Sequence, residues 1–96
     1  MTGNASLLRD NADAHRFELP LPGGEVAFAA YRQSKPGVLH IVHVEVPRAV
    51  EGRGVGSTVM KVVLEEVRAR GQKVVPVCGF AAAYMRRHPE VQDLLA

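Results

Sequence analysis

The sequence has no tryptophan, few aromatic residues and a single cysteine. Aromatic residues make up 5% of its 96 residues, so Val, Leu, Ala and Ile must supply most of the core. The lone Cys78 cannot form an internal disulfide, which predicts a reducing, cytoplasmic setting. No apolar run approaches the roughly 20 residues that span a bilayer, so we expect no transmembrane helix. The first six residues lack the basic-then-apolar order of a secretory signal.

The chain also lacks internal repeats, low-complexity tracts and blocks of like charge. A net charge of +2 without a dense basic stripe, with few aromatic residues for stacking and no recognition motif, argues against a nucleic-acid-binding module. Hydrophobic residues are 47% of the chain, which is ordinary for a globular protein. A chain of this length can bury a modest core without disulfides or a structural metal. We therefore expect a single domain over residues 1–96, with residues 1–12 loose.

The first half of the sequence predicts three short strands. His15–Leu19 alternates in polarity, Glu25–Gln33 places Val26, Phe28 and Ala30 on one parity, and Val38–Val46 is rich in β-branched residues. Two short turn clusters rich in Gly and Pro join these strands. Such short connections predict an antiparallel meander of three strands.

The second half predicts a βαβ unit. Val55, Val59, Val63 and Val67 recur every four residues, which indicates a helix over Val55–Arg70 with one apolar stripe. Gly71 is a natural stop for this helix. The segment Lys73–Val77 then predicts a strand parallel to the third strand, because a crossover helix joins them. Short helices are expected over Phe80–Arg87 and after Pro89, so the predicted fold class is α/β (α+β).

The first candidate site is the segment between the third strand and the helix, which contains Gly52, Gly54 and Gly56. Glycines let the backbone approach a ligand closely, and the start of a helix presents unpaired N–H groups that suit a phosphate. Arg53 adds a positive charge. The segment has no Lys for a P-loop, and its glycine spacing does not fit the dinucleotide fingerprint. The alternative is a plain connection in which Ser57 caps the helix.

The second candidate site is the pair His43 and Glu45 at the end of the third strand. In a regular strand these two side chains share a face with Leu39 and Ile41, whereas Val42 and Val44 share the other face with His40. Ligands of open α/β units bind beyond the carboxyl ends of the strands, where the pair lies. His43 or Glu45 can then take a proton from an amine substrate. Alternatively both are ordinary polar residues, and a β-bulge would change the parity.

The third candidate site is the end of the fourth strand. Pro76 cannot donate a ladder hydrogen bond, so pairing near it must fail and open a slot beside the third strand. Cys78 lies at the mouth of this slot, either as a nucleophile or as a small buried apolar residue. Tyr84 in the next helix can donate a proton to a leaving thiolate, or can simply anchor that helix. No residues have the spacing of metal ligands, so no metal is expected.

Together these residues resemble the GNAT acetyltransferase superfamily, and closely its short YjdJ-type branch. The resemblance runs through nearly the whole chain, and the ordered series of motifs is its strongest feature. The motifs are Arg9-Asp10-Asn11, His15 to Leu19, His43-Val44-Glu45-Val46-Pro47, Gly52 to Ser57, Pro76-Val77-Cys78-Gly79-Phe80, and Tyr84 to Glu90.

The resemblance implies a GNAT-like fold with splayed parallel strands that binds acetyl-CoA (coenzyme A). It places the pyrophosphate on the glycine segment, the pantetheine arm between the splayed strands and the thioester carbonyl at the backbone of the third strand. It also implies that Tyr84 protonates the departing thiolate, and that Cys78 either forms an acyl-cysteine or contacts the acetyl group. The cofactor-binding residues implied are Val44, Val46, Arg53, Gly54, Val55, Gly56, Ser57 and Thr58.

The sequence departs from the superfamily pattern in two ways. Glu51 stands where the motif usually begins with Gln or Arg, and a carboxylate there would repel a pyrophosphate. The segment Pro20–Gly24 replaces the helices that usually serve the acceptor substrate. We therefore expect acetyl transfer from acetyl-CoA to an amine acceptor, either a small molecule or a protein. The alternative function is a non-catalytic or very slow acyl-CoA-binding or sensing module.

Overall fold

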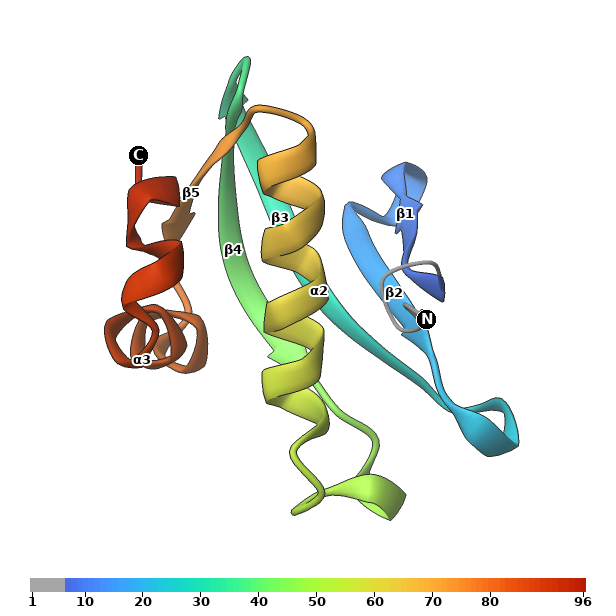
Figure 1. Ribbon diagram of the computed structural model, residues 1–96. Coiled ribbons are helices and arrows are strands. Elements are labelled where there is room, and N and C mark those ends of the chain that lie inside the picture. Colours follow the sequence, from blue (N-terminus) through green and yellow to red (C-terminus); the bar gives the residue numbers. More distant parts are fainter. Residues whose placement is uncertain (1–6) are drawn as a thin grey trace.

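The computed structural model describes residues 7–96 and contains one five-stranded sheet in the order β1-β2-β3-β4-β5 (Figure 1). The strands are β1 (Arg9–Asn11), β2 (Arg16–Pro20), β3 (Val26–Lys35), β4 (Val38–Glu45) and β5 (Lys73–Pro76). The α-helices are α2 (Val55–Ala69) and α3 (Gly79–Arg87). Four 3-10 turns complete the described elements: η1 (Ala12–Ala14), η2 (Pro22–Gly24), η3 (Arg48–Val50) and η4 (Pro89–Leu94).

The predicted topology of the sheet is confirmed. Strands β2, β3 and β4 form an antiparallel meander, and β4 pairs in parallel with β5 after the α2 crossover. The turn from β3 to β4 has only two residues, Pro36 and Gly37, and Gly37 adopts a positive φ of 82° that glycine accommodates without strain. The elements form one α+β domain. No helix of residues 7–96 is long and apolar enough to cross a membrane.

Helix α2 covers one face of the sheet and builds the core (Figure 1). Its predicted valine stripe is buried, with Val59, Val63 and Val67 fully inaccessible to solvent. The helix ends where Gly71 takes a φ of 69° and donates its N–H to the carbonyl of Arg68. Because five β-branched valines lower helix propensity, burial of this stripe stabilises α2 more than its intrinsic preference does.

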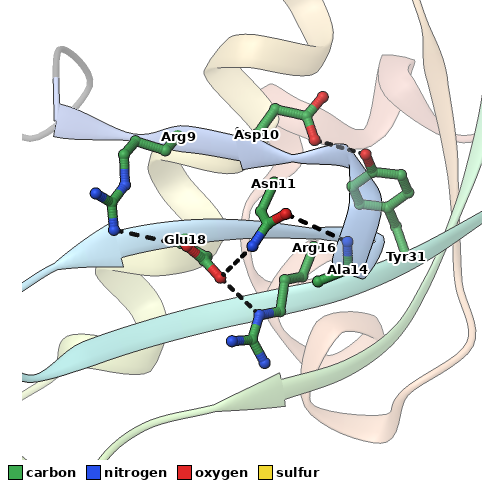
Figure 2. A network of polar contacts seen from close by, with 7 residues as sticks. All are labelled: Arg9, Asp10, Asn11, Ala14, Arg16, Glu18 and Tyr31. Carbon is green, nitrogen blue, oxygen red and sulfur yellow. Dashed lines mark hydrogen bonds and ion pairs between the residues drawn. The ribbon is translucent and has the colours of Figure 1, made fainter.

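The expectation that residues 1–12 are loose is wrong for the strand residues Arg9–Asn11. These residues form β1, which pairs antiparallel with β2, while residues 1–6 of the expected loose segment lie outside the described part of the chain. Figure 2 shows side chains that hold β1 in place. Glu18, only 8% exposed, accepts hydrogen bonds from Arg16 Nε at 2.7 Å and Asn11 Nδ2 at 3.1 Å. These charge-assisted contacts hold the three-residue strand β1, which no hydrophobic pattern in the sequence predicts.

Asp10 links β1 to two other elements. Its carboxylate accepts hydrogen bonds from the hydroxyl of Tyr31 on β3 (Figure 2) and from Arg70 Nη1, at 3.0 Å, just beyond the end of α2. Sixty residues separate Asp10 from Arg70 in sequence. The carboxylate therefore ties the edge strand to the sheet and the helix at once.

Strand β4 contains an irregularity that changes which side chains share a face. Ala30 pairs with His43, but the next residue, Tyr31, pairs with Ile41, so Val42 is an extra residue in β4. The regular alternation predicted for this strand is therefore wrong beyond Ile41. Val44 lies on the α2 face and packs against the core, whereas His43 lies on the opposite face, which we call the open face.

The bulge also brings together residues that the sequence prediction had separated. His40 and His43 now share the open face, because the bulge shifts the pattern by one residue. Glu45 lies there too, exposed like His43, instead of sharing a face with the buried Leu39 and Ile41. The bulge thus moves the proposed base from the helix side of the sheet to the open side.

Candidate functional site

The glycine segment before α2 leaves the start of that helix uncapped by any side chain. Gly54 is the N-cap residue with a φ of 75°, and Gly52 has a φ of 82°. The first bond of the helix runs from the N–H of Thr58 to the carbonyl of Gly54, at 3.1 Å. The amides of Val55, Gly56 and Ser57 precede that bond, so helix geometry leaves them without intrahelical acceptors. Three N–H groups at the positive end of a 15-residue helix suit an anion.

A hollow of about 260 Å³ lies over this segment. The backbone of the glycine segment, the side chain of Val46 and the ring of Phe80 line it. A Cβ atom built on Gly56 would stand 2.9 Å from Phe80 Cζ, so only glycine lets the ring lie this close to the helix start. Phe80 is 45% exposed, which is unusual for a large apolar side chain. The hollow therefore combines hydrogen-bond donors with an apolar wall.

The charged residues of the segment do not all support anion binding. Arg53 is exposed and does not line the hollow, whereas the exposed Glu51 does. Thr58 is already engaged, because its hydroxyl and its amide both donate to the carbonyl of Gly54. The donors that remain for a ligand are the backbone amides before it. Ser57 is in the first turn of α2 and not at the cap, which is Gly54.

Strands β4 and β5 part beyond Ile41. Their pairing ends where Ile41 lies opposite Pro76, as the missing proline N–H predicts. The amides of Val77 and Cys78 then both donate to the carbonyl of Ile41, at 2.9 and 3.0 Å. Because β4 continues to Glu45, its last four residues have no β5 partner in the described part of the chain. Their backbone groups face the gap between the two strands.

The gap between β4 and β5 is flanked by different residues on the two faces of the sheet. Cys78 is the N-cap residue of α3 and packs partly buried against the core, hence on the helix side. Val42 and His43 begin the unpaired part of β4 on the open side. A group lying in the gap would contact a thiol on one side and approach an imidazole on the other. The two sides of the gap therefore carry different chemical groups, a thiol and an imidazole.

His43 and Glu45 form a pair on the open face. His43 Nε2 lies 2.8 Å from Glu45 Oε1, and each side chain is 57% exposed. The centre of the Phe28 ring lies 6.1 Å from the centre of the His43 imidazole ring. Arg16 stacks on the same Phe28 ring, with its guanidinium carbon 4.3 Å from the ring centre. A carboxylate that orients an imidazole is an arrangement that can accept a proton.

Tyr84 belongs to α3 and is only 8% exposed; it lines a hollow together with residues of α2. Its ring stacks on that of His88, with the ring centres 3.8 Å apart. Burial raises the pKa of Tyr84, and the carboxylates of Glu90 and Glu65 raise it further. The phenol therefore stays protonated at neutral pH and can act as a proton donor.

The structure brings most of the predicted residues to two neighbouring regions. Small hollows connect the glycine segment to Tyr84: Ser57 and Phe80 line the hollow over the helix start and also the next one, which reaches Tyr84 and His88. Cys78 begins α3, so Tyr84 lies six residues along, about 9 Å from it along the helix axis. His43 and Glu45 are separate from these hollows and lie on the other face of the sheet.

Sequence reasoning missed Phe80 and His88 as members of the site. The sequence shows Phe80 only as part of a motif. Its contact with Gly56 could not be predicted, because it joins two helices that are distant in sequence. His88 follows Tyr84 by four residues, a spacing that places both on one side of a helix and could have revealed the stack. Within residues 7–96, no three His, Cys, Asp or Glu side chains lie close enough together to hold a metal ion.

The five-stranded mixed sheet with two diverging parallel strands, and a glycine-rich start to the crossover helix, defines an α+β protein with the N-acetyltransferase fold. The NMR solution structure of a GCN5-like protein from Staphylococcus aureus has the same fold, with a TM-score of 0.71. The match has 23% sequence identity and covers 99% of this chain and 91% of that one. Comparison with curated proteins finds no match.

The chain belongs to the GCN5-related N-acetyl-transferase family. The sequence model of this family matches residues 16–94, which include β2 through η4. The family membership and the fold confirm the resemblance to the GNAT acetyltransferase superfamily.

Proposed function

We propose that this protein binds acetyl-CoA and transfers its acetyl group to an amine. The observation that carries the proposal is the divergence of β4 and β5 directly beside the uncapped start of α2. The first feature offers a slot with free backbone groups, and the second offers three amides for a pyrophosphate. Membership of the GCN5-related family supports the same chemistry.

The residues present fit acetyl-CoA. The amides of Val55, Gly56 and Ser57 would hold the pyrophosphate, and Arg53 would add charge from the rim. Val46 and Phe80 would contact the apolar part of the arm, and the backbone of β4 around Val44 would polarise the thioester carbonyl. When bound, acetyl-CoA supplies the acetyl group as a thioester.

Two groups of side chains would move the protons. On the open face, the His43–Glu45 pair accepts the proton that the acceptor amine must lose. On the helix side, the hydroxyl of Tyr84 donates a proton to the departing thiolate, a role that its raised pKa supports by keeping it protonated. Cys78 would contact the acetyl group, or carry it as an acyl-cysteine.

A second candidate function is an acyl-CoA-binding or sensing module with little or no turnover. It is favoured by Glu51, whose carboxylate lines the hollow over the glycine segment and opposes a pyrophosphate there. Either function suits a reducing cytoplasmic setting, in which Cys78 keeps its free thiol. The short YjdJ-type branch is the part of the superfamily that we propose for this chain.

Calorimetric titration with acetyl-CoA tests both functions. We expect heat and a rise in melting temperature, and absence of both at millimolar ligand would refute both proposals. Release of CoA in the presence of amines then separates them, because a sensing module releases none above background hydrolysis. Intact-mass measurement after incubation with acetyl-CoA tests the acyl-cysteine: a mass increase present in the natural chain and absent in Cys78→Ala would support it.

A further inference from the structure

A partly enclosed hollow of about 350 Å³ lies beside β3 where its pairing with β2 ends, and nothing in the proposed cofactor site uses it. Its walls come from three elements: Ala14 and His15 at the end of η1, Ala30 and Arg32 with their neighbours on β3, and Val42 on β4. The volume is at the lower end of the range for small-molecule sites, about 300–1,000 Å³. It is therefore suited to a small ligand and not to a folded protein.

Val42 joins this hollow to the gap between β4 and β5. It is the extra residue of the bulge and also the first residue of β4 beyond the last β4–β5 pair. The neighbouring His43 pairs with Ala30, which lines the hollow. A ligand in the hollow would thus lie beside the gap and beside the His43–Glu45 pair.

The hollow has a positive lining. Arg32 is exposed and, like Arg48, Arg53, Arg86 and Arg87, takes part in none of the ion pairs formed within residues 7–96; it is the arginine among these that lines the hollow. His15 lines the same hollow, and no carboxylate does. An unpaired guanidinium in a lined hollow suits a carboxylate of the ligand, which it can bind with two hydrogen bonds.

Backbone hydrogen bonds hold the turn at His15, which forms one wall of the hollow. His15 has a φ of 57° and is the one non-glycine residue with positive φ in the described part of the chain. Its carbonyl accepts a hydrogen bond from the N–H of Tyr31, at 2.9 Å, which fixes the turn against β3. The same residue closes η1, because His15 is its C-cap and donates its N–H to the carbonyl of Ala12.

We propose that this hollow binds the acceptor, and that the acceptor is a small amino acid-like molecule with a carboxylate and a primary amine. Its carboxylate binds Arg32 and its amine lies toward His43. The proposal rests on the proposed acetyl transfer. In that transfer the acceptor nitrogen forms a bond to the acetyl carbon while the thioester C–S bond breaks. The amine proton goes to the His43–Glu45 pair, and the leaving sulfur takes a proton from Tyr84.

Strand geometry sets the size of the acceptor. Arg32 is two residues along β3 from Ala30, the cross-strand partner of His43. With a rise of about 3.4 Å per residue and strands about 4.8 Å apart, the α-carbons of Arg32 and His43 are about 8 Å apart. Glycine is too short to bridge positions this far apart, so a chain of several carbons should join the two charged ends better.

Binding to the hollow can be measured without cofactor. The full chain, labelled with ¹⁵N, would be titrated with a series of ω-amino acids from glycine to 6-aminohexanoate. Matched alkylamines that lack the carboxylate would be titrated in parallel. We expect amide shifts at Ala30, Arg32 and Val42 that saturate for the longer amino acids and are absent for the alkylamines. Equal shifts with both series would overturn the proposal, because the carboxylate would then contribute nothing. Absence of shifts at about 50 mM ligand would overturn it too, because a dissociation constant above that concentration is too weak for specific binding.

Two variants test the role of the guanidinium. Arg32→Gln should weaken amino acid binding about tenfold or more, because the charge-assisted pair is lost. Lys35→Gln is the matched control, since Lys35 is an exposed cation three residues away on the same strand but outside the hollow. In CoA-release assays Arg32→Gln should raise the KM for the amino acid and leave the KM for the alkylamine unchanged. Equal effects of the two variants would show that only general surface charge matters.

The failures of the two proposals are distinguishable on the same sample. Acetyl-CoA should shift the amides of Gly54 to Ser57, and the amino acid should shift those of Ala30 to Arg32. If acetyl-CoA gives no shift while the amino acid binds, the acetyl-transfer proposal fails and the pocket stands as a binding site. If acetyl-CoA binds and amines are acetylated with no preference for a carboxylate, the acceptor proposal fails alone.

Discussion

His43 Nε2 lies 2.8 Å from Glu45 Oε1, on the face of the sheet opposite α2. The two residues are separated by Val44, whose side chain packs on the other face against the core. The pair exists on the open face because the bulge at Val42 shifts the strand by one residue. The proposed base therefore lies on the face of the sheet opposite the one on which α2 and α3, with the proposed proton donor Tyr84, pack.

Substitutions at this pair should change activity and leave stability almost unchanged. Glu45→Gln and His43→Asn remove a pair whose side chains are each 57% exposed, so we expect changes in the free energy of unfolding of at most about 0.5 kcal/mol. Loss of a general base should lower kcat by about 10²-fold or more. Urea unfolding and CoA-release assays measure the two effects. Variants that are stable and fully active would exclude the pair as the base.

The order of the elements could be predicted because short-range patterns specify it. The turn residues Pro36 and Gly37 and the valine stripe of α2 act through neighbours close in sequence. Parallel pairing of β4 and β5 then follows because the helix α2 connects them in a right-handed crossover. Pro76 identified the point of divergence because a residue without an N–H cannot extend the ladder.

The faces of β4 and the strand β1 could not be predicted in this way. The bulge at Val42 is a property of the β3–β4 pair, and nothing in the β4 sequence alone requires it. Strand β1 is held by Glu18 and Asp10, whose partners lie between 2 and 60 residues away. The contact of Phe80 with Gly56 is equally long-range. Each missed feature depends on side chains that meet only after the sheet has formed.

Two glycine substitutions separate ligand binding from stability. In Gly56→Ala the new methyl group meets Phe80 Cζ at 2.9 Å, but this exposed ring can swing away, and alanine improves helix propensity by about 1 kcal/mol. We expect nearly unchanged stability and acetyl-CoA binding weakened about tenfold, because the methyl group intrudes on the close approach of backbone to ligand.

Gly54→Ala is the matched variant with the opposite stability effect. An added Cβ at Gly54 meets no atom within 4 Å, but its φ of 75° strains an alanine. The free energy of unfolding should fall by about 1 kcal/mol. Thermal melts and calorimetry measure both effects. Gly56→Ala with normal acetyl-CoA affinity would place the ligand elsewhere.

Tyr84→Phe should lower kcat more than it raises KM, since the hydroxyl acts after the acceptor has bound. Burial raises the pKa of Tyr84, so the natural protein should keep its rate through neutral pH and lose it only when the phenol ionises above pH 10. That alkaline decline should disappear in Tyr84→Phe. His88→Gln, which removes the stacked ring, is the control for changes in packing. An unchanged pH profile of kcat in Tyr84→Phe would remove its role as proton donor.

Glu18 should stabilise the fold against acid. Hydrogen bonds from Arg16 and then from Asn11 lower the pKa of Glu18 below the ordinary value of 4.5. The unfolded chain therefore binds a proton at a higher pH than the folded chain does. Stability from this carboxylate is present above about pH 4.5 and is lost as the pH falls through the lower folded pKa.

The variant Glu18→Gln tests this acid dependence. It should cost about 1–2 kcal/mol at neutral pH and flatten the fall in stability below pH 4.5. Glu25→Gln, at an exposed turn position, is the control and should change neither quantity. Urea unfolding at a series of pH values gives both. If the free energy of unfolding falls equally steeply at low pH in Glu18→Gln and in the natural chain, other carboxylates cause the acid dependence.

Tyr31 should make the fold sensitive to alkali. Burial, and then the hydrogen bond that its hydroxyl donates to Asp10, raise the pKa of Tyr31 to about 12. An unfolded tyrosine ionises near pH 10, so the unfolded chain loses this proton first. The stabilising effect is complete below pH 10 and is lost between pH 10 and the folded value of about 12. A shift of this size corresponds to about 2–3 kcal/mol.

Comparison with Tyr31→Phe isolates the contribution of Tyr31 to alkaline stability, because the variant and the natural chain contain the same other groups that titrate at high pH. The natural chain should lose more stability than Tyr31→Phe between pH 10 and 12, although the variant is less stable at pH 7 by about 1–2 kcal/mol. Asp10→Asn removes the charge that the hydroxyl faces, so it should lower the pKa of Tyr31 toward the ordinary value. Ultraviolet titration of the phenolate measures that shift. Parallel stability curves for the natural chain and Tyr31→Phe above pH 10 would show that ionisation of Tyr31 does not govern the alkaline transition.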